Sequence, residues 1–251
     1  TIDKAQGLSD AGISSVHYTP QHGVLLVGYE NGNLDILKNG KVTNYPYLNE
    51  YSYHNKKRIG NICFLNGKAL LSCPFGIAVF NPKQGVYEET YLPQMGQIKV
   101  NDVAYDDTYL YAATQRGLYY ARVDASDLYD PSAWTQATGF PEYNRAVRRI
   151  EVFSGYTVIE LNNGSQPDNI YYGKQTGPYE LLLEEDVIFM NHSSEFLYIG
   201  LPDYLYTYRD ELGLAGSISR YAYQDPHPTS IFPDKNGTLW IGDSKSGLIK
   251  H

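Results

Sequence analysis

The feature that most constrains the fold is a hairpin of two apolar runs that recurs along the chain. In residues 234–250, DKNGTLWIGDSKSGLIK, an Asn-Gly turn, an apolar run, a Gly-bearing turn and a second apolar run follow one another. Related stretches begin at Gly23, Lys68, Thr108, Tyr156 and Phe196. Apolar runs of this length, bounded by turn residues, are typical of β-strands. The sequence therefore predicts one supersecondary unit repeated six times.

The spacing of the six copies indicates what the unit is. Equivalent positions lie 45, 40, 47, 40 and 42 residues apart, at Gly28, Cys73, Ala113, Glu160, Gly200 and Gly242. A period near 42 residues is typical of a four-stranded β-propeller blade. The third strand of the first copy, NLDILK, should place Leu34 and Ile36 on one face and Asp35 and Leu37 on the other. A more polar fourth strand closes every copy except the last.

We therefore predict an all-β fold, a β-propeller of four-stranded antiparallel blades in a single domain. Sheets of this kind have two apolar faces, and packing them face to face around an axis covers both. We expect the chain to be a fragment of a longer protein. Either its N-terminal strand completes the sixth blade, which is the preferred interpretation, or a whole blade, or half of a larger ring, has been trimmed from one end. The expected blades cover residues 11–48, 58–94, 98–138, 145–185, 186–224 and 228–251, the last together with 1–5.

Composition agrees with strands joined by tight turns and excludes some partners. The chain has 25 Tyr, 8 Phe, 23 Gly and 13 Pro, and its net charge is −8. This acidic balance argues against nucleic acid as a partner, because nucleic-acid binders carry a basic stripe. No apolar run is long enough to predict a membrane span. Cys63 and Cys73 would lie about three residues out of register across an Asn66-Gly67 turn, so we expect free thiols.

Two stretches resemble a known repeat. Residues 7–37, GLSDAGISSVHYTPQHGVLLVGYENGNLDIL, and residues 228–250, PTSIFPDKNGTLWIGDSKSGLIK, are similar to the two-component-regulator propeller repeat. Asp243 stands where that family usually has Thr, and the middle copies keep only FGI at 75–77 and RGL at 116–118. The matching positions are Gly7, Leu8, Ser9, Asp234, Gly237, Leu239, Trp240, Ile241, Gly242, Gly247 and Leu248.

Within that superfamily the chain is most similar to the N-terminal β-propeller family of PorZ, a component of the Bacteroidetes type IX secretion system. The phrases GLSDAGIS, VGYENGNLDIL and FGIAVFNPKQGVYEETY carry this resemblance. It implies a non-enzymatic binding or scaffold role in the periplasm or at the outer membrane surface. It also implies secretion-complex proteins, including a sortase, and anionic lipopolysaccharide or another glycan as partners. A periplasmic ligand-sensing propeller of a hybrid two-component regulator is the alternative.

The sequence shows no familiar catalytic arrangement. H-E-x-x-H, C-x-x-C, G-x-S-x-G and P-loop motifs are absent. The carboxylates that adjoin in sequence, at 88–89 and 184–185, should point to opposite faces of their strands, whereas a glycosidase needs a convergent pair. We therefore expect no catalytic residue, no metal and no cofactor, and a propeller glycosidase or lyase is the least favoured alternative.

Two connections between blades are the candidate ligand-binding segments. Residues 47–58 and 138–149 combine aromatic and cationic side chains, which suit a sugar or an anionic glycan through stacking and charge-assisted hydrogen bonds. The alternative is a pair of solvated loops whose tyrosines cover strand ends. Arg148 and Arg149 fall on a first strand, so either could point into the channel. The candidate residues are Tyr51, Tyr53, His54, Lys57, Tyr143, Arg145, Arg148 and Arg149.

Overall fold

The computed structural model consists almost entirely of β-strands in six antiparallel sheets. It describes residues 7–20, 22–50, 56–219, 228–234, 238–245 and 247–250. The chain divides into two compact units. Unit 1 comprises residues 1–137 and 146–148, and unit 2 comprises residues 138–145 and 149–251. The sheets are the blades of a β-propeller, which is the fold that the repeat predicts.

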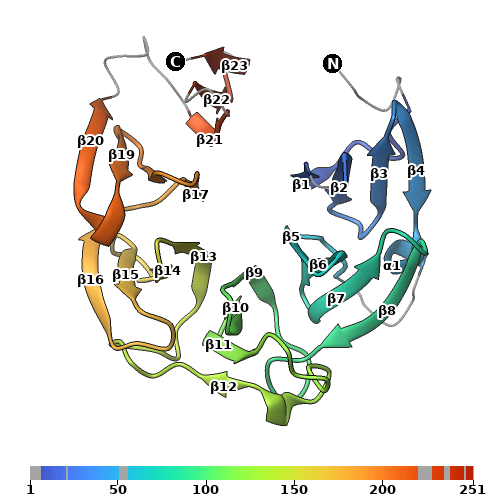
Figure 1. Cartoon of the computed structure of the whole chain (residues 1–251), viewed down its shortest axis with the longest axis horizontal. Helices are drawn as coiled ribbons and strands as arrows, with labels where there is room; N and C mark the ends of the chain where they lie inside the picture. The colour runs from blue at the N-terminus through green and yellow to red at the C-terminus, as the bar shows by residue number, and fades with distance from the viewer. Residues whose placement is uncertain are drawn as a thin grey trace. The chain divides into compact units, whose positions relative to one another are not determined.

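Unit 1 contains the first three blades, each with strands in sequence order (Figure 1). Blade 1 consists of β1 (Ile13–Thr19), β2 (Val24–Tyr29), β3 (Leu34–Lys38) and β4 (Lys41–Tyr45). Blade 2 consists of β5 (Asn61–Leu65), β6 (Lys68–Cys73), β7 (Gly76–Asn81) and β8 (Val86–Tyr91). Blade 3 consists of β9 (Val100–Tyr105), β10 (Tyr109–Thr114), β11 (Gly117–Arg122) and β12 (Thr135–Gln136).

Unit 2 contains the other three blades, apart from residues 147–148 at the start of β13. Blade 4 consists of β13 (Val147–Phe153), β14 (Tyr156–Leu161), β15 (Asn169–Gly173) and β16 (Tyr179–Glu184). Blade 5 consists of β17 (Phe189–His192), β18 (Leu197–Gly200), β19 (Tyr204–Tyr208) and β20 (Leu214–Ser219). Blade 6 consists of β21 (Pro228–Pro233), β22 (Leu239–Asp243) and β23 (Gly247–Lys250). The expected fourth strand of blade 6, residues 1–5, lies outside the described residues.

Short helical turns occupy some of the connections. The 3-10 turn η2 (Pro131–Ala133) falls inside the one segment, residues 124–134, where the sequence allows a helical turn. The side chain of Asp130 caps it by accepting a hydrogen bond from the Ser132 amide. Two further turns are additional to the sequence prediction: α1 (Tyr47–Glu50), after blade 1, and η3 (Asp210–Leu212), between β19 and β20.

The register of the second blade confirms the turn that was read from sequence. Leu65 lies opposite Lys68 across a two-residue turn, and Asn66 and Gly67 both have positive φ, 50° and 80°. Asn-Gly favours this turn because both residues tolerate that conformation. Cys63 therefore pairs with Leu70, as expected, and neither cysteine forms a disulfide.

The alternating pattern of β3 separates two cores. Leu34 and Ile36 pack into an apolar cluster that blades 1 and 2 share, together with Phe80 of blade 2. Asp35 points to the opposite face, where it is fully buried beside Tyr29. The prediction that β3 has two different faces is confirmed, and Asp35 is the buried polar residue of the second face.

Polar side chains of the first strands join neighbouring blades. Within unit 1, Ser15 Oγ donates to the Ile59 carbonyl at 2.9 Å, and Asn101 Nδ2 donates to the Val147 carbonyl at 2.7 Å. Within unit 2, Asn191 Nδ2 donates to the Ile231 carbonyl at 2.8 Å. Each bond satisfies a backbone acceptor in the segment that begins the next blade.

Candidate functional site

The connection between blades 1 and 2 is only partly described. Tyr51, Tyr53 and His54 lie outside the described residues. Lys57 is half-buried and donates from Nζ to the Asn49 carbonyl. Its ammonium group therefore holds the connection against the end of α1.

The connection that enters blade 4 presents two of the predicted side chains on the surface of unit 2. Arg145 pairs with Glu142 at 2.9 Å and donates to Asn163 Oδ1 at 2.5 Å. Tyr143 is 40% exposed. Phe140 is buried and packs its ring against Tyr179, so it anchors the loop beneath the exposed residues.

The two arginines of β13 differ in their surroundings. Arg148 is exposed. Arg149 pairs with Glu160 and also donates to the carbonyls of Val187, at 3.1 Å, and Ile188, at 2.7 Å. Arg149 thus joins blade 4 to blade 5, as Asn191 joins blade 5 to blade 6.

Glu160 is a fully buried carboxyl group on β14. Burial raises its pKa to about 7, although the Arg149 guanidinium acts in the opposite direction. Asp168, which is also buried, raises the pKa further through a hydrogen bond between the two side chains and through the repulsion between their charges. The cluster lies inside the blade, so its carboxyl groups are closed to solutes and serve the packing of blade 4 on blade 5.

Unit 1 contains a cationic cleft that the sequence did not predict. We call it the lysine cleft; it has a volume of about 530 Å³ at the ends of blades 1 and 2. Because the strands are antiparallel, this end carries the β1–β2, β3–β4, β5–β6 and β7–β8 turns, and the connection after β4 leaves from the other end. The lining residues are His22, Val24, Ile36, Lys38, Asn39, Lys41, Thr43, Tyr45, Phe64, Gly67, Pro82 and Lys83.

The aromatic wall of the lysine cleft is held from behind. The rings of Phe64 and His22 lie 5.1 Å apart, and the ring of Tyr45 lies 4.9 Å from that of Phe80, which is fully buried. Gly85 has a φ of +70°, and a Cβ there would lie 2.8 Å from Tyr45 Cε1. A glycine at this position therefore lets the β7–β8 turn approach the tyrosine closely.

The turn that carries Lys83 is ordered by its own hydrogen bonds. Asn81 Oδ1 accepts from the amides of Lys83, at 3.1 Å, and Gln84, at 3.2 Å. Asn81 Nδ2 in turn donates to Glu88 Oε1 at 2.8 Å. Such a turn positions its backbone without a ligand.

The charge in the lysine cleft is one-sided. Within the described part of the chain, Lys38, Lys41 and Lys83 are exposed and make no ion pair, and no carboxylate lines the cleft. The neighbouring Lys68 is different, because it pairs with Glu88 at 2.6 Å. The cleft can bind an anion, and its described lining offers no carboxylate for acid–base catalysis. Lys38 and Lys41 flank one hairpin turn, and Lys83 lies on another that is more than forty residues away in the sequence. No sequence motif therefore predicts that they line one cleft.

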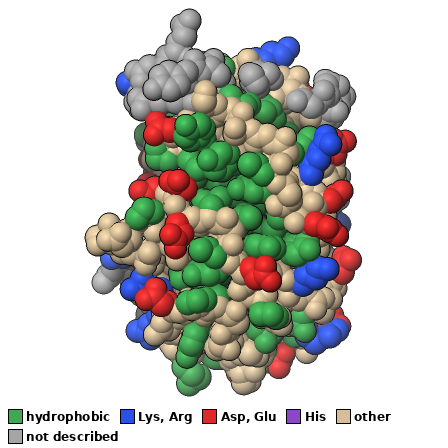
Figure 2. Space-filling view, turned by 90° about the vertical axis from the view of Figure 1, so that its left-hand side faces the viewer, with side chains coloured by type: hydrophobic (Ala, Val, Ile, Leu, Met, Phe, Trp, Pro, Cys, Tyr) green, Lys and Arg blue, Asp and Glu red, His purple; other side chains and the backbone are tan. Residues whose placement is uncertain are grey.

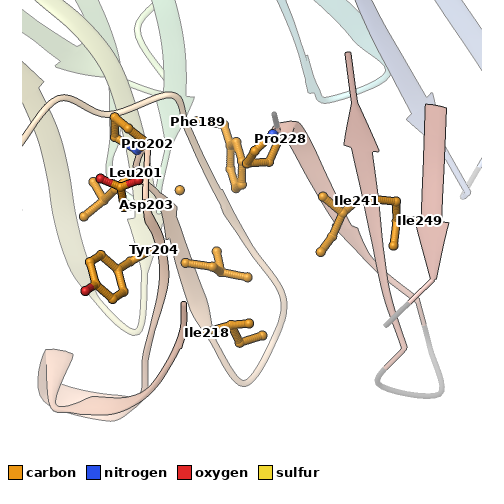
Figure 3. Close-up of a pocket in the computed structure, with 11 residues that line it drawn as sticks. Phe189, Leu201, Pro202, Asp203, Tyr204, Ile218, Pro228, Ile241 and Ile249 are labelled. Atoms are coloured by element: carbon orange, nitrogen blue, oxygen red, sulfur yellow. The ribbon is translucent and has the colours of Figure 1, made fainter. Parts of the chain in front are cut away.

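A second pocket lies between blades 5 and 6 of unit 2 (Figure 3). Phe189, Ile241 and Ile249 point into it, and its lining is almost wholly apolar. Its volume is about 20 Å³, enough for little more than one water molecule. We interpret it as loose packing between two blades rather than as a ligand site.

Other kinds of site find no support among the described residues. In that part of the chain no three His, Cys, Asp or Glu side chains are grouped so that they could hold a metal ion. The same residues include no helix of sufficient length and apolar character to cross a membrane.

Comparison with known proteins identifies the family. The model of the PorZ N-terminal β-propeller domain, from the type IX secretion system, matches residues 1–135, which is more than half of the chain. The chain belongs to the PorZ N-terminal β-propeller family. The resemblance stated from sequence is therefore confirmed. No curated protein matches the chain.

Solved structures agree on the fold. PorZ of Porphyromonas gingivalis, described as an essential bacterial surface component of the type IX secretion system, is 23% identical with a TM-score of 0.81. The match covers 99% of this chain and 32% of the PorZ chain. Extracellular domains of two putative hybrid two-component systems of B. thetaiotaomicron are 15% and 18% identical, both with TM-scores of 0.71. They cover 100% and 98% of this chain and 35% and 32% of theirs, so the chain spans about a third of each relative.

Proposed function

We propose that this propeller is a non-enzymatic binding and scaffold unit of type IX secretion machinery, in the periplasm or at the outer membrane surface. It docks secretion-complex proteins and an anionic glycan. The observation that carries the proposal is the match of the PorZ family model to residues 1–135. PorZ of P. gingivalis is itself a surface component of that system.

An exposed apolar surface on unit 2 supports docking of a protein partner. Leu181 of β16 is 47% exposed, and Leu214 of β20 is 61% exposed. Figure 2 looks onto these outer strands and shows hydrophobic side chains open to solvent among carboxylates. Exposed apolar side chains gathered on one face and rimmed by charge are typical of protein-binding surfaces.

The connections between blades remain proposed contacts for the glycan. On unit 2, Tyr143 is exposed and Arg145 is held in place by Glu142, so they offer a ring and a guanidinium group. On unit 1, Arg148 is exposed. Lys57 and Arg149 already bind backbone carbonyls, so we expect them to position their segments. The proposal includes Tyr51, Tyr53 and His54 from the sequence alone.

Replacement of the apolar surface in the full-length protein tests the docking role. In a bacterium with type IX secretion, L181D/L214D should abolish co-purification with the secretion-complex sortase and reduce surface attachment of cargo. The matched control is Val86→Asp on β8, which is 44% exposed and lies on unit 1. Unchanged co-purification and cargo attachment for L181D/L214D would contradict docking through this face.

The sensor alternative has one observation in its favour. The extracellular domains of two hybrid two-component systems match nearly the whole chain at a TM-score of 0.71. At under 25% identity this similarity shows the fold alone, because one fold serves many functions. The full-length gene distinguishes the two: a membrane span and a kinase domain after the propeller would support the sensor.

A further inference from the structure

We propose that the lysine cleft of unit 1 binds an acidic saccharide unit, a sugar ring that carries a carboxylate, sulfate or phosphate group. This rests on the glycan-binding part of the proposed function and assigns it a place. That place is the hairpin end of blades 1 and 2, at the opposite end of the strands from the connection at 47–58.

Charge selects the anionic part of the ligand. Lys38, Lys41 and Lys83 come from two blades and surround one cleft without a carboxylate in its described lining. The protein as a whole carries a net charge of −8, so this local excess of positive charge runs against the overall balance. A cleft lined by one sign of charge concentrates ligands of the opposite sign. Ammonium groups on flexible stems act as point charges for such a ligand.

The walls select a ring. Phe64 and Tyr45 present half-buried aromatic side chains to the cleft, and Asn39 and Thr43 add groups that can hydrogen-bond to hydroxyls. A bare inorganic anion needs no such wall. The volume of about 530 Å³ lies in the range of about 300–1,000 Å³ that is typical of small-molecule sites.

The site exists before its ligand arrives. The buried ring of Phe80 packs against Tyr45, and the Asn81-capped turn orders the backbone of Lys83. Among the described lining residues, the three exposed lysine side chains lose the most freedom on binding. Preorganisation of this kind lowers the entropic cost of binding.

Calorimetric titration of the 251-residue chain with small probes tests the proposal. The probes are glucuronic acid and glucose 6-phosphate, with glucose and inorganic phosphate as references. We expect each acidic sugar to bind at least tenfold more tightly than glucose, and glucose 6-phosphate at least tenfold more tightly than phosphate. Raising the salt concentration should weaken the binding of both acidic sugars.

Variants locate the site. K38Q/K41Q/K83Q should lower the affinity for both acidic sugars at least tenfold. K99Q/K174Q/K250Q removes three other exposed lysines and should leave the affinity unchanged. Phe64→Leu should weaken glucose 6-phosphate binding while leaving phosphate binding unchanged, because it removes the ring wall and keeps the charge. Circular dichroism checks that each variant is folded.

The other outcomes overturn the inference in distinguishable ways. Phosphate that binds as tightly as glucose 6-phosphate would make the cleft a simple anion site. Hexaglutamate that competes more strongly than either sugar would make it a peptide site. Full sugar affinity in K38Q/K41Q/K83Q would place the glycan elsewhere and leave the proposed function standing.

Discussion

The buried carboxylate of Asp35 provides a sharp test of how the first blade is anchored. It has no exposed surface and accepts four hydrogen bonds. Oδ2 accepts from the Ser9 amide and from Tyr29 Oη, each at 2.7 Å. Oδ1 accepts from Ser9 Oγ at 2.6 Å and from Asn44 Nδ2 at 2.7 Å. Asp35 thus ties the GLS motif at the start of the chain to β2, β3 and β4.

Replacing Asp35 with Asn keeps the shape and removes both the charge and one acceptor. In one amide orientation the new NH₂ group faces the Ser9 amide, a donor that cannot reverse. In the other it faces Asn44 Nδ2, and a flip of the Asn44 amide would break its hydrogen bond to Asn33 Oδ1. One charge-assisted bond, worth about 1.5–3 kcal/mol, is lost, and the other three weaken to neutral strength. The neutral amide is less costly to bury, which offsets part of the loss. We expect Asp35→Asn to lower the free energy of unfolding by about 3 kcal/mol.

Urea unfolding followed by tyrosine fluorescence measures this change, and hydrogen exchange localises it. Amides of β2, β3 and β4 should exchange faster, whereas amides of blade 3 should not. Ser9→Ala removes only the Oγ bond and should cost about 1 kcal/mol. Asp107→Asn, at an exposed carboxylate, is the matched control and should cost nearly nothing. A loss below about 1 kcal/mol for Asp35→Asn, or an equal loss for Ser9→Ala, would refute the reasoning.

Three further predictions concern buried groups. The raised pKa of Glu160 means that ionisation of this buried carboxyl group lowers stability: the loss is absent below about pH 4.5 and reaches about 3 kcal/mol as pH rises through about 7. Glu160→Gln should flatten this dependence in thermal unfolding at pH 5 and pH 8. A Cβ at Gly200 would lie 2.2 Å from Phe189 Cζ, so Gly200→Ala should cost about 1–3 kcal/mol in urea unfolding, whereas Gly12→Ala, whose Cβ would meet nothing closer than 3.5 Å, should be nearly neutral. Burial raises the pKa of the Cys73 thiol to about 12, so mass spectrometry should detect no iodoacetamide labelling of Cys73 at pH 8 until urea unfolds the protein.

Local patterns determined the blades and their turns. The alternation of β3, the Asn66-Gly67 turn and the short turn at 131–133 all follow from residues close together in sequence. Each is governed by backbone conformation or by which face of a strand is apolar, and both properties can be read within a few residues. The repeat then extends one blade to six, because the same local choices return every forty-odd residues.

The tertiary structure alone decided what the polar side chains do. Arg149 is a candidate ligand-binding residue by sequence, and the structure adds that it binds Glu160 and two carbonyls of the next blade. Lys38 and Lys83 stand on turns of different blades, and only the packing of blade 1 on blade 2 brings them to one cleft. Contacts between residues some forty positions apart depend on how one blade packs on the next. The periodicity within a single strand does not encode this packing, so the sequence predicted the blades and the family but not the lysine cleft.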